Sequence, residues 1–491
     1  MLLSIASGLI LALALPRPGT WVAAWIGLVP IMLALRGMGA WRAGVCGLIT
    51  GLVYYGIILH WISLFGYLPW FLLITYQALY IAIFAAIYVR LQPTKIGWLG
   101  YAAVPAAWVT LQFIRTLGTY AFTWGSFAHT QADNLLVAQI ASITGPWGID
   151  FLVCLVNLVL ATAVFGPLRK TAPIATACVL IAATCAFGFV SLNTKNTESN
   201  AKPIAIIQGG VSAGFDAPPD YTQRAWNIYK SLTTHIAKNR PEVIVWPETS
   251  LPADISTPPW NSLLCKLANS CNTELFVGAY DTDPKTERSY NSLFRCNSHI
   301  EDKAYHKVRL VPFGEFVPMR KKLSFLKNYG VRPDDLLAGE NHVLLDSKLG
   351  KLGVSICFES LFSAVARSET RAGAKVLCVV TNDSWFQRSQ AAHEHLMMAQ
   401  LRAIENRRFV LRAAQTGISA LIDPYGRVRS QLGIYRHGAV FGKVQPSAQL
   451  TLYSKYGDWF AFASIAIIIL GAAVSVRSAR TSLSPKPRRE I

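Results

Sequence analysis

Residues 353–360 read Gly-Val-Ser-Ile-Cys-Phe-Glu-Ser, an apolar run that ends at Cys357. Such a run is typical of a buried strand, and the residues after it can begin a helix. Strand ends are where α/β folds present reactive side chains, so Cys357 is a candidate nucleophile. Buried cysteines are also common as inert packing residues, so the thiol needs partners before it can be assigned a reaction.

Two earlier segments offer such partners. Glu248 follows the apolar residues 243–246, and Lys307 lies in residues 305–315, which read Tyr-His-Lys-Val-Arg-Leu-Val-Pro-Phe-Gly-Glu. A free thiol has a pKa of about 8.5, so at neutral pH it needs a base or a cation beside it. A buried Glu248 can accept the thiol proton, and Lys307 can stabilise the oxyanion of a tetrahedral intermediate. Glu, Lys and Cys together indicate acyl transfer through a thioester, although a Glu or a Lys is usually a solvated surface residue.

The region from about Asn193 to Lys455 alternates short apolar runs with helix-like stretches. The predicted strands are residues 203–207, 242–246, 275–280, 352–356 and 375–380. The predicted helices are residues 221–238, 259–268, 361–372 and 393–406. Near-continuous apolar strands separated by helices predict an α/β domain with a buried sheet. Glu248 and Cys357 then both lie at strand ends.

The composition of the whole chain indicates a membrane protein. Of 491 residues, 52% are hydrophobic and 15% are charged, against roughly 25% charged in a typical soluble domain. A spanning helix needs roughly 20 apolar residues, and runs near this length are residues 2–15, 21–35, 43–64, 68–89, 99–114, 147–165, 173–192 and 459–476. The first run lacks a basic start, which favours an anchor over a secretion signal. The predicted organisation is a polytopic membrane domain with seven spans (1–192), a catalytic domain (193–457), an eighth span (458–476) and a basic cytoplasmic tail (477–491).

The charges between the spans predict the orientation. Cations gather in alternate connections and in the tail, at Arg36, Arg42, Arg90, Lys95, Arg169, Lys170, Arg477, Arg480, Lys486, Arg488 and Arg489. The other connections are poorer in cations, with Arg17 and Arg115. Because cation-rich loops face the cytoplasm, both termini are expected inside and residues 193–457 outside, on the periplasmic side in a bacterium. The net charge of +19 is spread along these membrane borders, so a nucleic-acid partner is not expected.

The connection from Gly118 to Gly145 is too polar to span a membrane, yet it carries Phe122, Trp124 and Phe127. Aromatic side chains often lie at the membrane–water interface. The connection is therefore either a packed loop or a surface through which lipid enters.

Five motifs carry a family resemblance. They are Trp246-Pro247-Glu248, His306-Lys307, Val311-Pro312-Phe313-Gly314-Glu315, Ile356-Cys357-Phe358-Glu359 and Thr381-Asn382-Asp383-Ser384-Trp385-Phe386. They resemble the carbon–nitrogen hydrolase (nitrilase) superfamily, which implies an α-β-β-α sandwich and a Glu248–Lys307–Cys357 triad. With the flanking spans and the segments 400–403, 417–420 and 423–426, nearly the whole chain resembles the apolipoprotein N-acyltransferase family.

This resemblance implies the last reaction of bacterial lipoprotein maturation, at the inner membrane. Glu248 would act as general base and Cys357 as nucleophile on the sn-1 ester of a phospholipid, typically phosphatidylethanolamine. The thioester would then acylate the N-terminal amine of a diacylglyceryl-cysteine apolipoprotein, with Lys307 stabilising both oxyanions. No metal or other cofactor is expected, because the ester already holds the acyl group in reactive form, and the protein is expected to be a monomer.

The resemblance also implies supporting residues. Glu315 resembles a second carboxylate that positions the lysine, and Glu359 resembles an acid that supports the site by hydrogen bonding. Asn291 is either a site residue or a turn residue. Phe358, where a tyrosine often stands, and Trp385 and Phe386 are candidate substrate-binding residues, and the latter two either line the acyl channel or pack the core.

Two other classes of protein would also account for part of the spans and the triad. A membrane-tethered nitrilase-type amidase would use the triad with water as the second substrate, but it would hardly need so many spans. A transporter or receptor with a soluble sensing domain would explain the spans and leave the triad accidental.

Cys265, Cys271 and Cys296 could pair in an oxidising compartment, with Cys265 and Cys271 the nearest partners in sequence.

Overall fold

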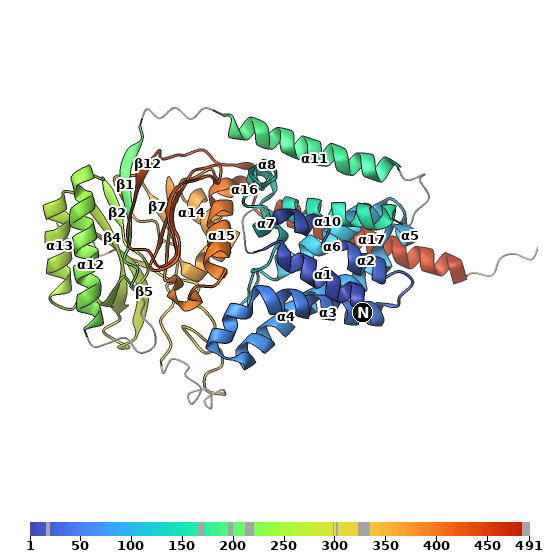
Figure 1. Ribbon diagram of the computed structural model, residues 1–491, viewed down its shortest axis with the longest axis horizontal. Helices are drawn as coiled ribbons and strands as arrows, with labels where there is room; N and C mark the ends of the chain where they lie inside the picture. The colour runs from blue at the N-terminus through green and yellow to red at the C-terminus, as the bar shows by residue number, and fades with distance from the viewer. Residues whose placement is uncertain are drawn as a thin grey trace, which may run out of the picture. The chain divides into compact units, whose positions relative to one another are not determined.

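The computed structural model describes residues 1–15, 20–164, 171–194, 200–211, 220–297, 299–300, 303–322 and 334–483. The chain forms two compact units (Figure 1). The first contains residues 1–117, 123–190 and 458–491, and the second contains residues 118–122 and 191–457. The cations predicted at Arg17, Arg169, Lys170, Lys486, Arg488 and Arg489 lie outside the described residues.

The first unit is helical. Its longer α-helices are α1 (Leu2–Leu13), α2 (Val29–Ala34), α3 (Ala40–Ile58), α4 (Tyr67–Leu91), α6 (Leu99–Ile114), α10 (Pro146–Ala163), α11 (Thr171–Leu192) and α17 (Trp459–Leu483). Its shorter ones are α5 (Pro93–Ile96), α7 (Phe127–Thr130), α8 (Leu135–Ala138) and α9 (Ala141–Thr144).

Among the described residues, five helices are long and apolar enough to cross a membrane: Ala40–Ile58, Tyr67–Ile96, Pro146–Ala163, Thr171–Leu192 and Trp459–Arg477. The runs predicted at 2–15, 21–35 and 99–114 form shorter apolar helices, so spans there remain a prediction. A membrane protein is nevertheless clearly indicated.

Small residues let the membrane helices approach each other closely. A Cβ atom on Gly47 would lie 2.5 Å from the carbonyl of Ile81, and one on Gly51 would lie 2.6 Å from the Cα atom of Ala78. Only glycine therefore allows this contact between α3 and α4, as is common at helix interfaces in membranes.

The connection from Gly118 to Gly145 is partly a packed loop. Trp124 and Phe127 are buried, and Phe127 stacks on Trp108 with ring centroids 4.6 Å apart. The buried guanidinium of Arg115 donates to the carbonyl of Trp124 at 2.5 Å, which fixes the start of the loop. These contacts support the packed alternative for Trp124 and Phe127.

The second unit contains two mixed sheets, as expected for the nitrilase-like sandwich. Within the described residues, one sheet has the order β12-β1-β2-β4-β5-β6 with β3 beside β4, and the other has the order β11-β10-β9-β8-β7. The first sheet's strands are β1 (Lys202–Gln208), β2 (Val243–Val245), β3 (Leu251–Asp254), β4 (Glu274–Thr282), β5 (Ser289–Cys296), β6 (Tyr305–His306) and β12 (Gly438–Val444). The second sheet's strands are β7 (Leu352–Ile356), β8 (Val376–Thr381), β9 (Val410–Ala414), β10 (Ser419–Ile422) and β11 (Val428–Leu432).

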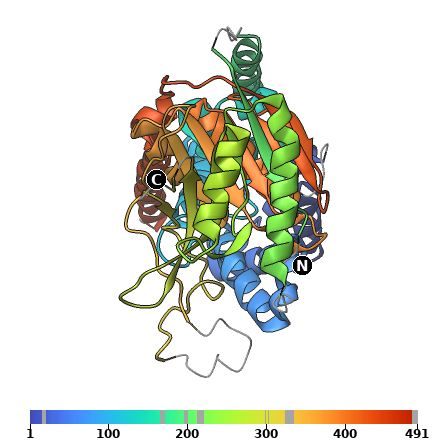
Figure 2. The same ribbon diagram turned by 90° about the vertical axis from the view of Figure 1, so that its left-hand side faces the viewer.

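Helices cover the outer face of each sheet, which gives four layers (Figure 1). The helices α12 (Tyr221–Ile236) and α13 (Trp260–Cys271) lie over the first sheet, side by side in Figure 2. The helices α14 (Ser363–Arg371) and α15 (Ala391–Asn406) pack on the second sheet, and a short α16 (Leu452–Tyr456) follows it. The predicted α-β-β-α sandwich is confirmed.

Strand periodicity explains the layers. In β1, Ile204 and Ile206 point into the core between the two sheets, whereas Ala205 and Ile207 pack against the helices. Both faces are buried, which is why the strand reads as a continuous apolar run. The strands β3, β5, β6 and β9 to β12 lie outside the predicted elements, because polar residues interrupt several of them.

The hypothesised cysteine pairing is wrong for this structure, in which Cys265, Cys271 and Cys296 are all free thiols. Cys265 and Cys271 both lie on α13, where six residues separate them by about 9 Å along the axis. A disulfide requires Cα atoms within about 7 Å. Cys296 is buried at the end of β5, in the core under the helices.

Candidate active site

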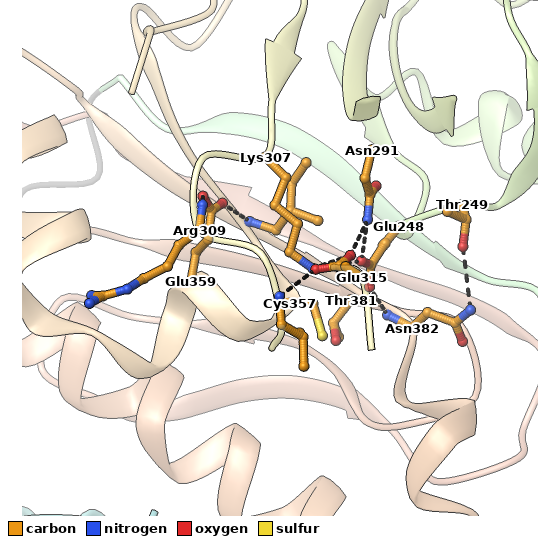
Figure 3. A network of polar contacts seen from close by, with 12 residues as sticks. Glu248, Thr249, Asn291, Lys307, Arg309, Glu315, Cys357, Glu359, Thr381 and Asn382 are labelled. Carbon is orange, nitrogen blue, oxygen red and sulfur yellow. Dashed lines mark hydrogen bonds and ion pairs between the residues drawn. The ribbon is translucent and has the colours of Figure 1, made fainter. Parts of the chain in front are cut away.

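Three strand ends bring the predicted triad together (Figure 3). Glu248 lies three residues after β2, Lys307 follows β6 directly, and Cys357 follows β7 directly. Figure 3 shows the Cys357 sulfur beside the group formed by Glu248, Glu315 and Lys307. Residues from both sheets therefore meet at one site.

Cys357 occupies a sharp turn between strand and helix. Its φ angle is +53°, in the left-handed region that non-glycine residues rarely adopt. The residue begins a 3-10 turn, Cys357–Leu361. A conformation of this kind costs about 1–3 kcal/mol and persists where the surroundings hold it, which is typical of reactive sites.

Lys307 is held between two carboxylates. Its Nζ atom lies 2.8 Å from Oε1 of Glu315 and 3.3 Å from Oε1 of Glu248, and the side chain is 1% exposed. Burial would lower the pKa of Lys307, but Glu315 and Glu248 outweigh burial and raise it above its ordinary value. Lys307 is therefore an ammonium that can stabilise an oxyanion.

Glu248 has a single orientation because both of its oxygens are bonded. Asn291 donates from Nδ2 to Oε1 at 2.7 Å, and the backbone N–H of Asn382 donates to Oε2 at 2.6 Å. Asn291 lies in strand β5 and also donates to Glu315 at 3.3 Å. Asn291 is thus a residue of the site and not of a turn.

The Cys357 thiol is protonated in the resting site. Burial and the neighbouring carboxylate of Glu248 raise its pKa, and Lys307 offsets only part of that rise. The sulfur therefore has to lose its proton as it attacks, which is the step that a nearby base assists.

Glu359 joins the nucleophile's turn to the segment that follows Lys307. Its Oε1 accepts from the backbone N–H groups of Val308 and Arg309 at 2.8 and 3.0 Å, and its Oε2 accepts from that of Ile356 at 2.7 Å. The Tyr305 hydroxyl donates to Oε2 at 2.9 Å. Burial outweighs these bonds and raises the pKa of Glu359 to about 7.

Two family models match this chain. Residues 7–159 match the apolipoprotein N-acyltransferase N-terminal domain, and residues 204–451 match carbon–nitrogen hydrolase. A relative from Geobacter metallireducens named apolipoprotein N-acyltransferase is 34% identical, over 97% of this chain and 95% of its own length. The chain belongs to the apolipoprotein N-acyltransferase family. A Gloeobacter violaceus relative of the same name is 28% identical, over 96% of this chain and 93% of its own.

A solved yeast structure, a Saccharomyces cerevisiae member of branch 10 of the nitrilase superfamily, is also similar to part of the chain. It is 18% identical, with a TM-score of 0.42, and the match covers 60% of this chain and 100% of that one.

Membership of the apolipoprotein N-acyltransferase family makes the protein an acyltransferase of the carbon–nitrogen hydrolase superfamily. The amidase alternative is not favoured, since the N-terminal family domain accompanies the hydrolase-like one. A transporter or receptor is not favoured for the same reason. The acyl-transfer chemistry agrees with the thiol, base and ammonium described above.

The aromatic candidates in this N-acyltransferase family member differ in exposure. Phe358 is buried and packs on Phe362 at 5.2 Å and on Phe122 at 6.5 Å between ring centroids. Phe386 is also buried and packs on the ring of His395. Trp385 is 38% exposed, so it differs from Phe386 in being available to a ligand. Their roles in substrate binding remain predictions.

Sequence reasoning missed the residues behind Cys357 in this family member. Asn382, through its backbone N–H, and the side chains of Thr381 and Asp383 reach the site from the end of β8. The motif at 381–386 contained them, but only the resemblance singled it out, and no role was assigned. Within the residues that the structure describes, no three His, Cys, Asp or Glu side chains are grouped to hold a metal ion.

Proposed function

We propose that this protein transfers an acyl chain from a phospholipid, through a thioester on Cys357, to the N-terminal amine of a diacylglyceryl-cysteine apolipoprotein. The supporting observation is the half-buried Cys357 beside the Glu248–Lys307–Glu315 group, in a chain whose helices suit a membrane. A lipid ester is the acyl donor that such a chain meets. Transfer to the lipoprotein completes its maturation.

In the first step Glu248 takes the thiol proton as the sulfur attacks the carbonyl carbon of the sn-1 ester. Lys307 donates hydrogen bonds to the tetrahedral oxyanion. When the carbon–oxygen bond breaks, Glu248 returns the proton to the departing alkoxide, and a lysophospholipid leaves. The acyl group remains on Cys357 as a thioester.

In the second step the amine of the apolipoprotein attacks the thioester. Glu248 accepts a proton from the amine nitrogen, Lys307 again holds the oxyanion, and the carbon–sulfur bond breaks. Glu248 then returns the proton to the Cys357 thiolate, which restores the starting site. Glu315 lies 2.8 Å from Nζ and so gives Lys307 a second carboxylate partner while Glu248 carries the proton.

The charge pattern supports a location for this reaction. We place the protein as a multi-pass monomer in the bacterial inner membrane, with residues 193–457 on the periplasmic side and residues 477–491 in the cytoplasm. Cations between the first and last predicted spans alternate in the way that positive-inside loops do. Phosphatidylethanolamine is the expected donor.

The experiment incubates the purified full-length protein with phosphatidylethanolamine labelled in its sn-1 chain. We expect a hydroxylamine-sensitive acyl adduct that is absent in Cys357→Ala. Cys271→Ala is the matched control, because Cys271 is a half-buried free thiol on α13, outside the site. Transfer of label to a diacylated lipopeptide distinguishes the acyltransferase from a hydrolase, which would release free fatty acid. An adduct that persists in Cys357→Ala would overturn the assignment of the nucleophile.

A further inference from the structure

A second buried group of polar side chains lies behind Cys357, and the proposed reaction does not use it. This Asp383 cluster consists of Asp383, Thr381, His395 and Arg412, and each of its side chains is at most 1% exposed. It draws on four elements: the end of β8, the 3-10 turn Asp383–Phe386 after it, the middle of β9 and helix α15.

Asp383 is the centre of the cluster. Its Oδ1 accepts from the Thr381 hydroxyl at 2.7 Å and faces Nδ1 of His395 at 3.1 Å, and its Oδ2 accepts from Nη2 of Arg412 at 2.7 Å. Burial alone would raise the pKa of Asp383, but Arg412 and His395 outweigh it and lower the pKa to about 2. Asp383 is therefore an anion, and His395 must present Nδ1–H to it.

The chain leaves no room for Asp383 to move. A Cβ atom on Gly417 would lie 2.1 Å from Oδ2 of Asp383, so only glycine fits there. Arg412 is fixed in turn by a hydrogen bond from its Nε to the carbonyl of Ile418 at 3.1 Å. The Asp383 carboxylate is therefore held in one position, and this fixes the orientation of the side chains bonded to it.

The first branch of the cluster reaches the thiol. Strands β7 and β8 are parallel, with Ile356 paired to Val380, so Cys357 and Thr381 end neighbouring strands at the same level. Figure 3 shows the Thr381 side chain next to the Cys357 sulfur. Thr381 has one hydroxyl hydrogen, which it donates to Asp383 while the thiol keeps its proton. When that hydrogen turns to the sulfur it stabilises the thiolate, which agrees with the lowering effect of Thr381 on the pKa of Cys357.

The second branch reaches the backbone of Cys357. Ser360 Oγ lies 2.8 Å from the carbonyl oxygen of Cys357 and 2.7 Å from Nε2 of His395, and Nε2 lies 3.3 Å from the same carbonyl. Burial and the charge of Arg412 lower the pKa of His395, so its ring is neutral and Nε2 can only accept. The single hydrogen of Ser360 Oγ is then shared between the carbonyl of Cys357 and Nε2 of His395. His395 thus positions the Ser360 hydroxyl, and that hydroxyl bonds the carbonyl of the residue whose φ angle is +53°.

Ser360, His395 and Asp383 have the connectivity of a serine-nucleophile triad, but they cannot act as one. Ser360 is 1% exposed, and its hydroxyl is already engaged by the carbonyl of Cys357 and by His395. Both branches end on Cys357 instead, one at its sulfur and one at its carbonyl.

We propose that Asp383 is a positioning residue for the nucleophile, which it holds in the left-handed turn by directing Thr381 to the sulfur and His395 with Ser360 to the carbonyl of Cys357. This inference rests on the proposed role of Cys357 and extends it. It gives the Thr-Asn-Asp motif at 381–383 a physical role, in which the side chains of Thr381 and Asp383 fix Cys357 and the N–H of Asn382 fixes Glu248.

Thr381→Val tests the first branch, because valine keeps the shape of threonine and removes only the hydroxyl. We expect kcat for acyl transfer to fall about tenfold while KM for the phospholipid stays within about twofold, since the loss concerns a buried hydrogen bond at the reacting atom. Alkylation of Cys357 by iodoacetamide at fixed pH should slow by a similar factor. Thr381→Ser should restore both rates to within about threefold of wild type.

Thr273→Val is the matched control. It also deletes one buried hydroxyl, which donates to the carbonyl of Pro241 at 2.9 Å before β4, and it should leave kcat and the alkylation rate unchanged. Ser360→Ala tests the second branch independently, with the same expected split between kcat and KM, should Thr381→Val fail to fold.

Wild-type rates in both Thr381→Val and Ser360→Ala would overturn the positioning role, as would a loss in Thr381→Val that serine does not restore. Failure of the proposed function looks different. In that case Cys357→Ala would keep acyl transfer, whereas the alkylation rates of the Thr381 variants would still report how the thiol is held.

Discussion

Two buried ionic groups flank Cys357, and they differ in charge balance. The Lys307 cluster, formed by Lys307, Glu248 and Glu315, has one cation for two carboxylates. In the Asp383 cluster one carboxylate faces one guanidinium, with a neutral imidazole beside them. The Lys307 cluster therefore has one more carboxylate than cations, whereas the Asp383 cluster has equal numbers of both.

This difference decides which group can take part in proton transfer. If Glu248 takes a proton, Lys307 still has Glu315 as a partner, so no buried charge is left unpaired. If Asp383 took a proton, the buried Arg412 would lose its counter-charge, which is unfavourable for a buried cation. A reacting site therefore needs one more carboxylate than its cations require, whereas a positioning site needs an exact match of charges.

The largest effect expected from breaking the Lys307 cluster is that of Glu248→Gln. The amide keeps the shape and can still accept from Asn382, but it cannot take the thiol proton, so thioester formation should fall by about a thousandfold. Single-turnover labelling of Cys357 with phosphatidylethanolamine measures this. A variant that still forms the adduct within tenfold of the wild-type rate would rule out Glu248 as the base.

Glu315→Gln sharpens the comparison, because it gives the Lys307 cluster the charge balance of the Asp383 cluster. Glu248 would then be the only carboxylate paired with Lys307, and proton uptake would leave a buried ammonium unpaired. We expect both half-reactions to slow roughly thirtyfold, less than for Glu248→Gln, because the base itself remains.

The control for that experiment is Glu340→Gln, which changes an exposed carboxylate outside the cluster. If Glu315→Gln slowed only one half-reaction, the role of Glu315 would not be to supply the second negative charge beside Lys307.

The sequence allowed much of this arrangement to be predicted, for reasons that are local. Glu248, Lys307 and Cys357 follow short apolar strands, and apolar strands with reactive residues at their ends are visible in the sequence. The strand predicted at 352–356 coincides with β7. The triad was therefore predicted from its own segments.

The Asp383 cluster could not be found in this way. Arg412 lies in the middle of β9, where a charged residue argues against a buried strand, and its partner Asp383 is 29 residues away. His395 lies within the helix predicted at 393–406, and nothing beside it in the sequence marks it as a partner of Asp383. What makes these residues a group is the pairing of β8 with β9 and the packing of α15, which are tertiary contacts.

The smallest expected effect concerns stability and pH. The folded pKa of Asp383 is about 2, below its ordinary value of 3.8. Its contribution is therefore fully present above pH 4 and is lost as the pH falls from about 4 towards 2, an amount of roughly 2 kcal/mol. In Asp383→Asn the thermal midpoint should be lower at pH 7, and the difference from wild type should shrink towards pH 2.

Glu359 provides the opposite case in the same unit. Its pKa rises from 4.5 to about 7, so the folded state binds its proton more tightly and loses stability as the pH rises from about 4.5 to 7. In a plot of stability against pH, Glu359→Gln should remove the decline between about pH 4.5 and 7 and keep the decline between about pH 4 and 2. Asp383→Asn should remove the decline between about pH 4 and 2 and keep the one between about pH 4.5 and 7. Parallel curves for wild type and Asp383→Asn between pH 2 and 4 would mean that Asp383 carries no stabilising charge, and the charge-balance distinction between the two clusters would then fail.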